Sequence, residues 1–155
     1  MKKRDRLAIV RQHYPRAVTT SESVDIAIDI FEEHLGIEAH QVMLADSICS
    51  DDVNTIEYPQ RAYDMLGPFK MGGLNGFPFT GLTGMGAFAG HVPDEGAVMV
   101  YYAPHIGITK TANLGEIARI GQKKHSGCCG AARAALAKLT RGDIIEGHVN
   151  ESTTR

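Results

Sequence analysis

The cysteines of this chain stand at two places, and each place is the predicted end of a secondary-structure element. Cys49 ends an apolar run, and Cys128 and Cys129 lie side by side in a small-residue turn before a predicted helix. His105 follows a second apolar run. Two thiolates and one imidazole are common zinc ligands, and three protein ligands leave one position open, as in catalytic rather than structural sites. The sequence therefore predicts a zinc site.

The choice among the neighbouring thiols and histidines stays open. A helix N-terminus favours the thiolate form at Cys128 and Cys129, but only one of them is expected to face the metal, since adjacent side chains diverge. The spacing His125-x-x-Cys128 also suits zinc, and His91 is a second alternative ligand or a proton carrier. A thiol redox protein that uses the two adjacent cysteines is disfavoured, because a bridge between neighbours is strained.

A carboxylate stands two residues after the first candidate ligand. Asp51 is close enough to Cys49 in the sequence to hydrogen-bond a water on the metal, or to replace that water as the fourth ligand. The alternative interpretation is a small buried cysteine followed by a turn aspartate. The two possible roles of Asp51 separate an active site from a closed one.

Two buried strands and three helices are expected to position these residues: strands at 41–48 and 97–102, and helices at 4–14, 23–35 and 129–139. Continuous apolar runs predict the strands, whereas three- and four-residue spacing with a start signal at Ser21 or Ser23 predicts the helix at 23–35. Both strands deliver a candidate ligand at their ends. Residues 113–120 are predicted as a short helix or a loop.

The segment 67–90 is rich in glycine and also apolar, because it carries Phe69, Phe77, Phe79 and Phe88. Such a composition predicts a folded loop that lines or covers a cavity, with glycines that allow close backbone approach. No Gly-Lys-Ser/Thr follows, and the glycine spacing does not fit a dinucleotide fingerprint, so a nucleotide site is not supported.

Length and charge limit the remaining function classes. The 155 residues suffice for one domain, with 1–22 as an N-terminal helical extension and 150–155 as a flexible tail. With 16 Lys and Arg against 18 Asp and Glu, the chain gives no electrostatic support for binding nucleic acid or a membrane. It contains no run of about 18 apolar residues. We expect a cytoplasmic protein with reduced thiols.

Ordered motifs between residues 42 and 139 resemble the limiting-CO2-inducible protein B family, which is related to β-class carbonic anhydrases. They are Cys49–Asn54, Met71–Phe79, Thr83–Phe88, His91–Asp94, Pro104–Ile108 and Cys128–Ala131. The resemblance implies a compact α/β domain with a central sheet flanked by helices, and a homodimer. It also implies a Cys-His-Cys zinc site and reversible hydration of CO2 to bicarbonate.

The chain departs from the β-class pattern Cys-x-Asp-x-Arg at one position, where Val53 replaces the arginine. In that pattern the arginine holds the aspartate away from the metal, so we expect Arg119 or Arg61 to take its place beside Asp51. If neither does, the alternative is a catalytically inactive zinc protein of the same fold, with a structural or bicarbonate-sensing role. The sequence Cys-Gly-Ala favours Cys129 as the third ligand.

Overall fold

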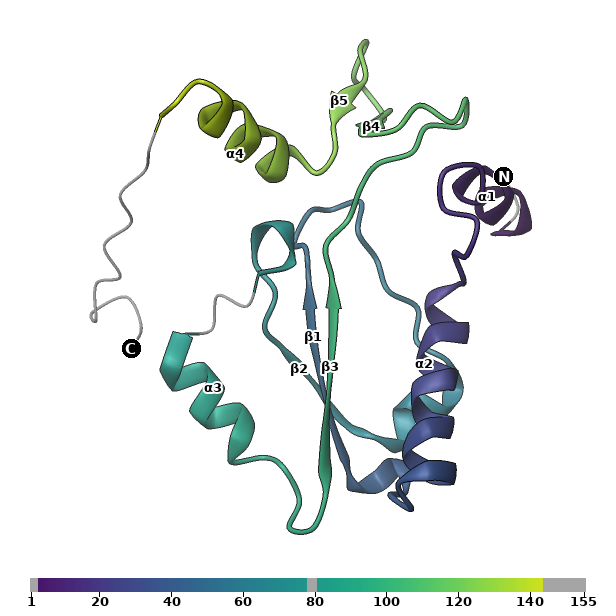
Figure 1. The fold of residues 1–155 in the computed structure, drawn as a ribbon, viewed down its shortest axis with the longest axis vertical. Coiled ribbons are helices and arrows are strands. Elements are labelled where there is room, and N and C mark those ends of the chain that lie inside the picture. The colour runs from purple at the N-terminus through teal and green to yellow at the C-terminus, as the bar shows by residue number, and fades with distance from the viewer. Residues whose placement is uncertain (1–2, 78–80, 144–155) are drawn as a thin grey trace. The chain divides into compact units, whose positions relative to one another are not determined.

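The computed structural model describes residues 3–77 and 81–143, which form two compact units (Figure 1). The first, called the sheet unit, runs from Thr19 to Pro104. The second, called the hairpin unit, combines residues 3–18 with residues 105–143. Phe79 and the predicted tail 150–155 lie outside the described residues.

The sheet unit is built on three parallel strands in the order β2-β1-β3. The central strand β1 (Val42–Ile48) and its neighbour β3 (Ala97–Ala103) confirm the two strands predicted from their apolar runs. The strand β2 (Leu66–Lys70) was not predicted, because a Gly-Pro pair interrupts its pattern. In the β1–β3 register, Ile48 pairs with Ala103, so the two strands end together.

One face of this sheet is covered by the helix α2 (Thr20–Asp29), which continues as a π-helical turn at Ile30–His34. Val24 and Ile28 of α2 are fully buried against Val42 and Leu44 of β1. The helix begins at Thr20, three residues before the predicted start at residue 23, because Thr19 caps it in a reciprocal pair with Glu22. The predicted amphipathic helix is otherwise confirmed.

The opposite face of the sheet is covered by the helix α3 (Gly81–Ala89), whose Phe88 packs against Met43 and Ala45 of β1. The prediction of a folded loop at 67–90 is therefore wrong in its second half, where packing against the sheet outweighs the low helix propensity of glycine. Short 3-10 helices complete this unit at Ala39–Gln41, Gln60–Asp64 and Leu74–Gly76. The chain is an α/β protein with a parallel sheet flanked by helices, as predicted.

The hairpin unit contains α1 (Lys3–Val10), two short antiparallel strands and α4 (Gly130–Thr140). The segment 113–120 is a loop, one of the two predicted alternatives, interrupted by the short strand β4 (Glu116–Ile117), which pairs with β5 (Ser126–Gly127). Two-residue strands have too few side chains to show a period, so the sequence does not reveal them. Among the described residues, none of the helices has the length and apolar character required to cross a bilayer.

Candidate functional site

Cys49 is fixed at the carboxyl end of β1. Its side chain is buried, with 1% of its surface exposed. The backbone N–H of Asn75 donates a hydrogen bond to the Cys49 sulfur across 3.1 Å, and the Asn54 side-chain amide donates to the Cys49 carbonyl across 3.0 Å. The segment at Asn75 therefore holds the Cys49 sulfur, and the segment at Asn54 holds the Cys49 backbone. An N–H aimed at sulfur is the kind of outer contact that orients a metal-binding ligand.

Cys49 and Asp51 line one pocket of about 180 Å³ in the sheet unit, together with Asp46, Ile48, Ser50, Asn54, Lys70 and Gly72. The Asp51 carboxylate accepts a hydrogen bond from the Val53 backbone N–H across 3.3 Å. Gly72 lies so close to the Ile48 backbone that a Cβ there would overlap it. The predicted use of glycine for close backbone approach is confirmed at this position.

A buried carboxylate in this pocket was missed by sequence reasoning. Asp46 on β1 has 1% of its surface exposed and accepts a hydrogen bond from the Tyr58 hydroxyl across 3.1 Å. Its same oxygen forms an ion pair with the Lys70 ammonium on β2. Burial and the nearby Asp46 carboxylate raise the pKa of Tyr58, so its hydroxyl stays a donor. A charged residue inside the apolar run 41–48 was the available signal.

The other predicted ligands belong to the hairpin unit. Cys128 and Cys129 are buried, with 2% and 4% of their surfaces exposed, and Cys129 is the N-cap residue of α4. The backbone of Cys128 is held on both sides, since its N–H donates to Gly115 and its carbonyl accepts from Gly107. A Cβ on Gly107 would lie 2.7 Å from the Cys128 Cβ. The chain just after His105 thus runs directly beside Cys128.

The two alternative histidines have partners of their own. His125 lies beside Glu116, with 3.3 Å between Nδ1 and the carboxylate, and both side chains are exposed. In the sheet unit, Nδ1 of His91 lies 2.6 Å from the carbonyl oxygen of Ala87 in α3. His91 is exposed, and this contact involves its Nδ1 atom.

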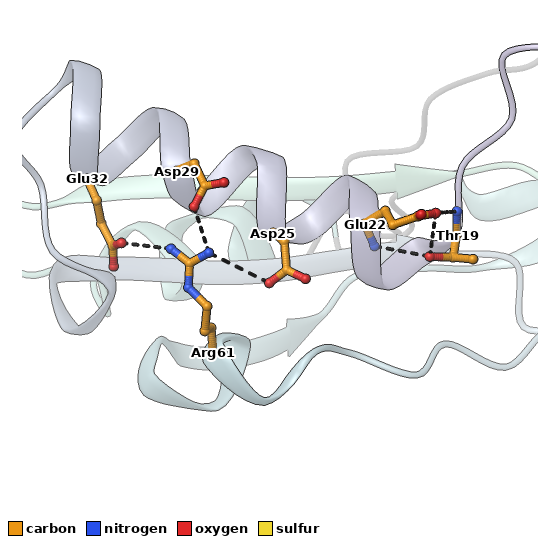
Figure 2. A network of polar contacts seen from close by, with 6 residues as sticks. All are labelled: Thr19, Glu22, Asp25, Asp29, Glu32 and Arg61. Carbon is orange, nitrogen blue, oxygen red and sulfur yellow. Dashed lines mark hydrogen bonds and ion pairs between the residues drawn. The ribbon is translucent and has the colours of Figure 1, made fainter.

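Figure 2 shows the partners of Arg61, one of the two arginines expected beside Asp51. Its guanidinium reaches Asp29 at 2.6 Å, Glu32 at 2.7 Å and Asp25 at 3.8 Å, all on α2 or the turn that continues it. The hydrogen bond to Asp29 is the main reason that the pKa of Arg61 is raised. Arg61 thus ties the segment Gln60–Asp64 to α2. Arg119, on the loop between β4 and β5, is the candidate that remains.

Comparison with solved structures finds close relatives. The crystal structure of PtLCIB4, a homolog of the limiting CO2-inducible protein LCIB, shares 34% identity with this chain. It matches with a TM-score of 0.70 over 95% of this chain and 62% of that one. A His-to-Ala variant of PtLCIB4 gives 36% identity, a TM-score of 0.70 and coverage of 88% and 57%. A Ser-to-Arg variant of PtLCIB4 shares 33% identity with this chain, and it matches with a TM-score of 0.66 over 95% of this chain and 62% of that one.

The present chain therefore spans about 62% of the length of the PtLCIB4 chain. The comparison with curated proteins finds no match. Residues 18–154 match the family described as limiting CO2-inducible proteins B/C, β carbonic anhydrases. With this match over most of its length and its similarity to PtLCIB4, the chain belongs to the limiting CO2-inducible protein B/C family of β-carbonic-anhydrase-related proteins.

Proposed function

We propose that this chain is a zinc-dependent carbonic anhydrase that catalyses the reversible hydration of CO2 to bicarbonate. The description of its family as β carbonic anhydrases supports the reaction class. The observation that carries the proposal is the common end of β1 and β3. Because Ile48 pairs with Ala103, Cys49 follows directly after one paired residue and His105 follows the other after Pro104.

Sites in open α/β sheets form at the carboxyl ends of the strands, where the loops that follow neighbouring strands meet. The register thus supports Cys49 and His105 as two ligands of one ion. We propose Cys128 or Cys129 as the third ligand. A set of two thiolates and one imidazole fits zinc in both ligand type and number, and leaves a fourth position open. A zinc ion bound there would lower the pKa of a water molecule and supply hydroxide near neutral pH.

The residues of the pocket have distinct proposed roles. Asp51 would orient the attacking water by accepting its hydrogen bond, and Arg119 would keep that carboxylate in place. The pocket, at about 180 Å³, has room for a small molecule such as CO2. His91 would pass the released proton to solvent, since it is exposed and its Nε2 is the nitrogen not directed at Ala87.

One observation favours a second candidate function, a zinc-binding structural or bicarbonate-sensing protein without activity. Valine stands at position 53, and the contacts of Arg61 join it to α2. Unless Arg119 holds Asp51, its carboxylate would take the fourth position and close the site. Replacing Arg119 by Met removes the cation while keeping much of the side-chain length. In the active enzyme this change should lower activity across the pH range, whereas an unchanged pH–rate profile would show that Arg119 is not the partner of Asp51.

Zinc content tests the ligand assignment. Protein purified under reducing conditions should hold about one zinc per chain, because these ligands bind zinc strongly. His105→Ala should lose the metal, whereas His125→Ala, a control on the same unit, should keep it. Cys128→Ser and Cys129→Ser should differ, since only one sulfur faces the ion. Metal analysis that finds full zinc in His105→Ala would overturn the assignment and point to His91 or His125.

A further inference from the structure

The sheet unit is strongly acidic, and one of its few cations lines the pocket. Residues 19–104 contain 13 Asp and Glu against 2 Lys and Arg, a net charge of −11. The two cations are Arg61, which binds carboxylates of α2 and its continuation, and Lys70, the last residue of β2. Among the described residues that line the pocket, Lys70 alone is positively charged, whereas Asp46 and Asp51 are carboxylates. Lys70 is therefore the side chain of this pocket whose charge favours an anion.

The position of Lys70 is set by the neighbouring strand. In the β1–β2 register Lys70 pairs with Asp46, and its ammonium forms an ion pair with Oδ2 of that carboxylate. The Asp46 side chain is 2% exposed, and the Tyr58 hydroxyl donates to the same oxygen across 3.1 Å. The Met71 N–H donates to the Asp46 carbonyl across 2.8 Å. A buried, hydrogen-bonded carboxylate thus holds the end of a long side chain that otherwise samples many rotamers.

The ammonium of Lys70 keeps donors for a second anion. A lysine ammonium has three N–H donors, and the described contacts of Lys70 use one of them. The Lys70 side chain is 69% exposed, so its head group is open to a molecule that enters from solvent. Bicarbonate is a small anion whose oxygens accept hydrogen bonds from an ammonium, whereas CO2 is uncharged. A cation at this place therefore distinguishes the product of the proposed reaction from its substrate.

We propose that Lys70 is the bicarbonate-binding residue of the pocket and that Asp46 positions it. This inference rests on the proposed function and adds the residue that recognises the product. Because the Asp46–Lys70 pair is neutral as a whole, the ammonium acts through directed, charge-assisted hydrogen bonds more than through net charge. The alternative role of the pair is purely structural. The two roles differ in what they require of the affinity for bicarbonate.

NMR titration of zinc-loaded protein with sodium bicarbonate, at constant ionic strength, tests the assignment. The backbone amide signals of Asn54 and Gly72, which line the pocket, should shift to saturation. Lys70→Met should raise the bicarbonate dissociation constant at least about tenfold, because a charge-assisted hydrogen bond is lost. Lys70→Arg, which keeps the charge, should stay within about threefold of the wild type. Lys138→Met removes the same charge from an exposed position on α4 and should leave the constant unaltered.

A double variant keeps the test valid if Lys70→Met folds poorly. Lys70→Met leaves the Asp46 carboxylate buried without its cation, which costs stability. Asp46→Asn combined with Lys70→Met removes both charges, preserves the net charge of the chain and should show the same loss of about tenfold. Pocket amides that do not shift in the wild type, a Lys70→Arg variant no tighter than Lys70→Met, or a double variant with wild-type affinity would overturn the assignment.

Hydration rates of the same samples separate this inference from the proposed function. The titration follows signals of the protein and requires no turnover. Bicarbonate binding that depends on Lys70, in a protein that does not hydrate CO2, would refute the proposed function alone. Rapid hydration together with a dissociation constant that is independent of Lys70 would refute the role of Lys70 alone.

Discussion

The sheet unit and the hairpin unit hold their candidate ligands by different means. In the sheet unit, Cys49 directly follows a seven-residue strand that is packed between two apolar clusters. In the hairpin unit, Cys128 follows a two-residue strand and is held by backbone hydrogen bonds to Gly107 and Gly115. The first position depends on side-chain packing, whereas the second depends on how closely backbone segments approach. Substitutions should therefore damage the two units through different mechanisms.

The largest effect on stability is expected in the core of the sheet unit. Leu44 of β1 is 1% exposed and packs against α2, so Leu44→Ala should lower the free energy of unfolding by about 3 kcal/mol through lost burial and a cavity. Leu136 of α4 is 64% exposed, and Leu136→Ala should cost less than about 0.5 kcal/mol. Urea denaturation measures both. Equal losses of unfolding free energy in the two variants would show that the two units do not differ in their dependence on side-chain packing.

A smaller loss of stability is expected in the hairpin unit, at a position where two backbone segments approach closely. Gly107→Ala would place a methyl group 2.7 Å from the Cys128 Cβ and 2.5 Å from the Glu116 carbonyl oxygen. We expect a loss of about 2 kcal/mol and weaker zinc binding, because overpacking shifts Cys128. Gly86→Ala in α3 is the matched control, since its Cβ would meet nothing within 4 Å. That change should be neutral or stabilise the protein, as alanine favours helix.

The smallest expected effect is a change in the rate of CO2 hydration that leaves stability and zinc content unchanged. Asp51→Asn keeps the size of the side chain and removes its charge, so zinc and stability should persist. CO2 hydration should fall at least about tenfold, as commonly follows the loss of a group positioned for the reacting proton. Stopped-flow rates on zinc-loaded protein measure the change. Faster hydration in Asp51→Asn would instead show that Asp51 closes the site in the wild type.

The sequence predicted the sheet unit better than the hairpin unit, for a physical reason. Residues 41–48 and 97–102 are continuous apolar runs, and runs of that kind lie in strands buried in parallel sheets. The strand Leu66–Lys70 contains glycine and proline, and the strands of the hairpin unit contain two residues each, so no periodic pattern marks them. Pairing with distant segments determines those elements.

The site residues were predictable where a candidate ligand directly follows an apolar run. They were not predictable where the contacting residues are distant from each other in the sequence. Cys49 and Asp51 were expected together from their spacing, and they line one pocket. The contacts of Asp46 with Tyr58 and Lys70 join residues 12 and 24 positions away, so no local pattern reveals them. Arg61 was one of two candidates for Asp51, but it binds Asp29 and Glu32, which lie 32 and 29 positions earlier in the chain.

The central claim is that zinc at Cys49 makes this chain a carbonic anhydrase. Stopped-flow CO2 hydration, measured under reducing conditions with the zinc content of each sample, tests it most directly. We predict that zinc-loaded wild-type protein accelerates hydration well above the buffer rate, and that Cys49→Ser loses both the metal and the acceleration. Wild-type protein that carries one zinc per chain but hydrates CO2 no faster than buffer at any pH from 6 to 9, a window chosen around the expected pKa of about 7, would contradict the claim.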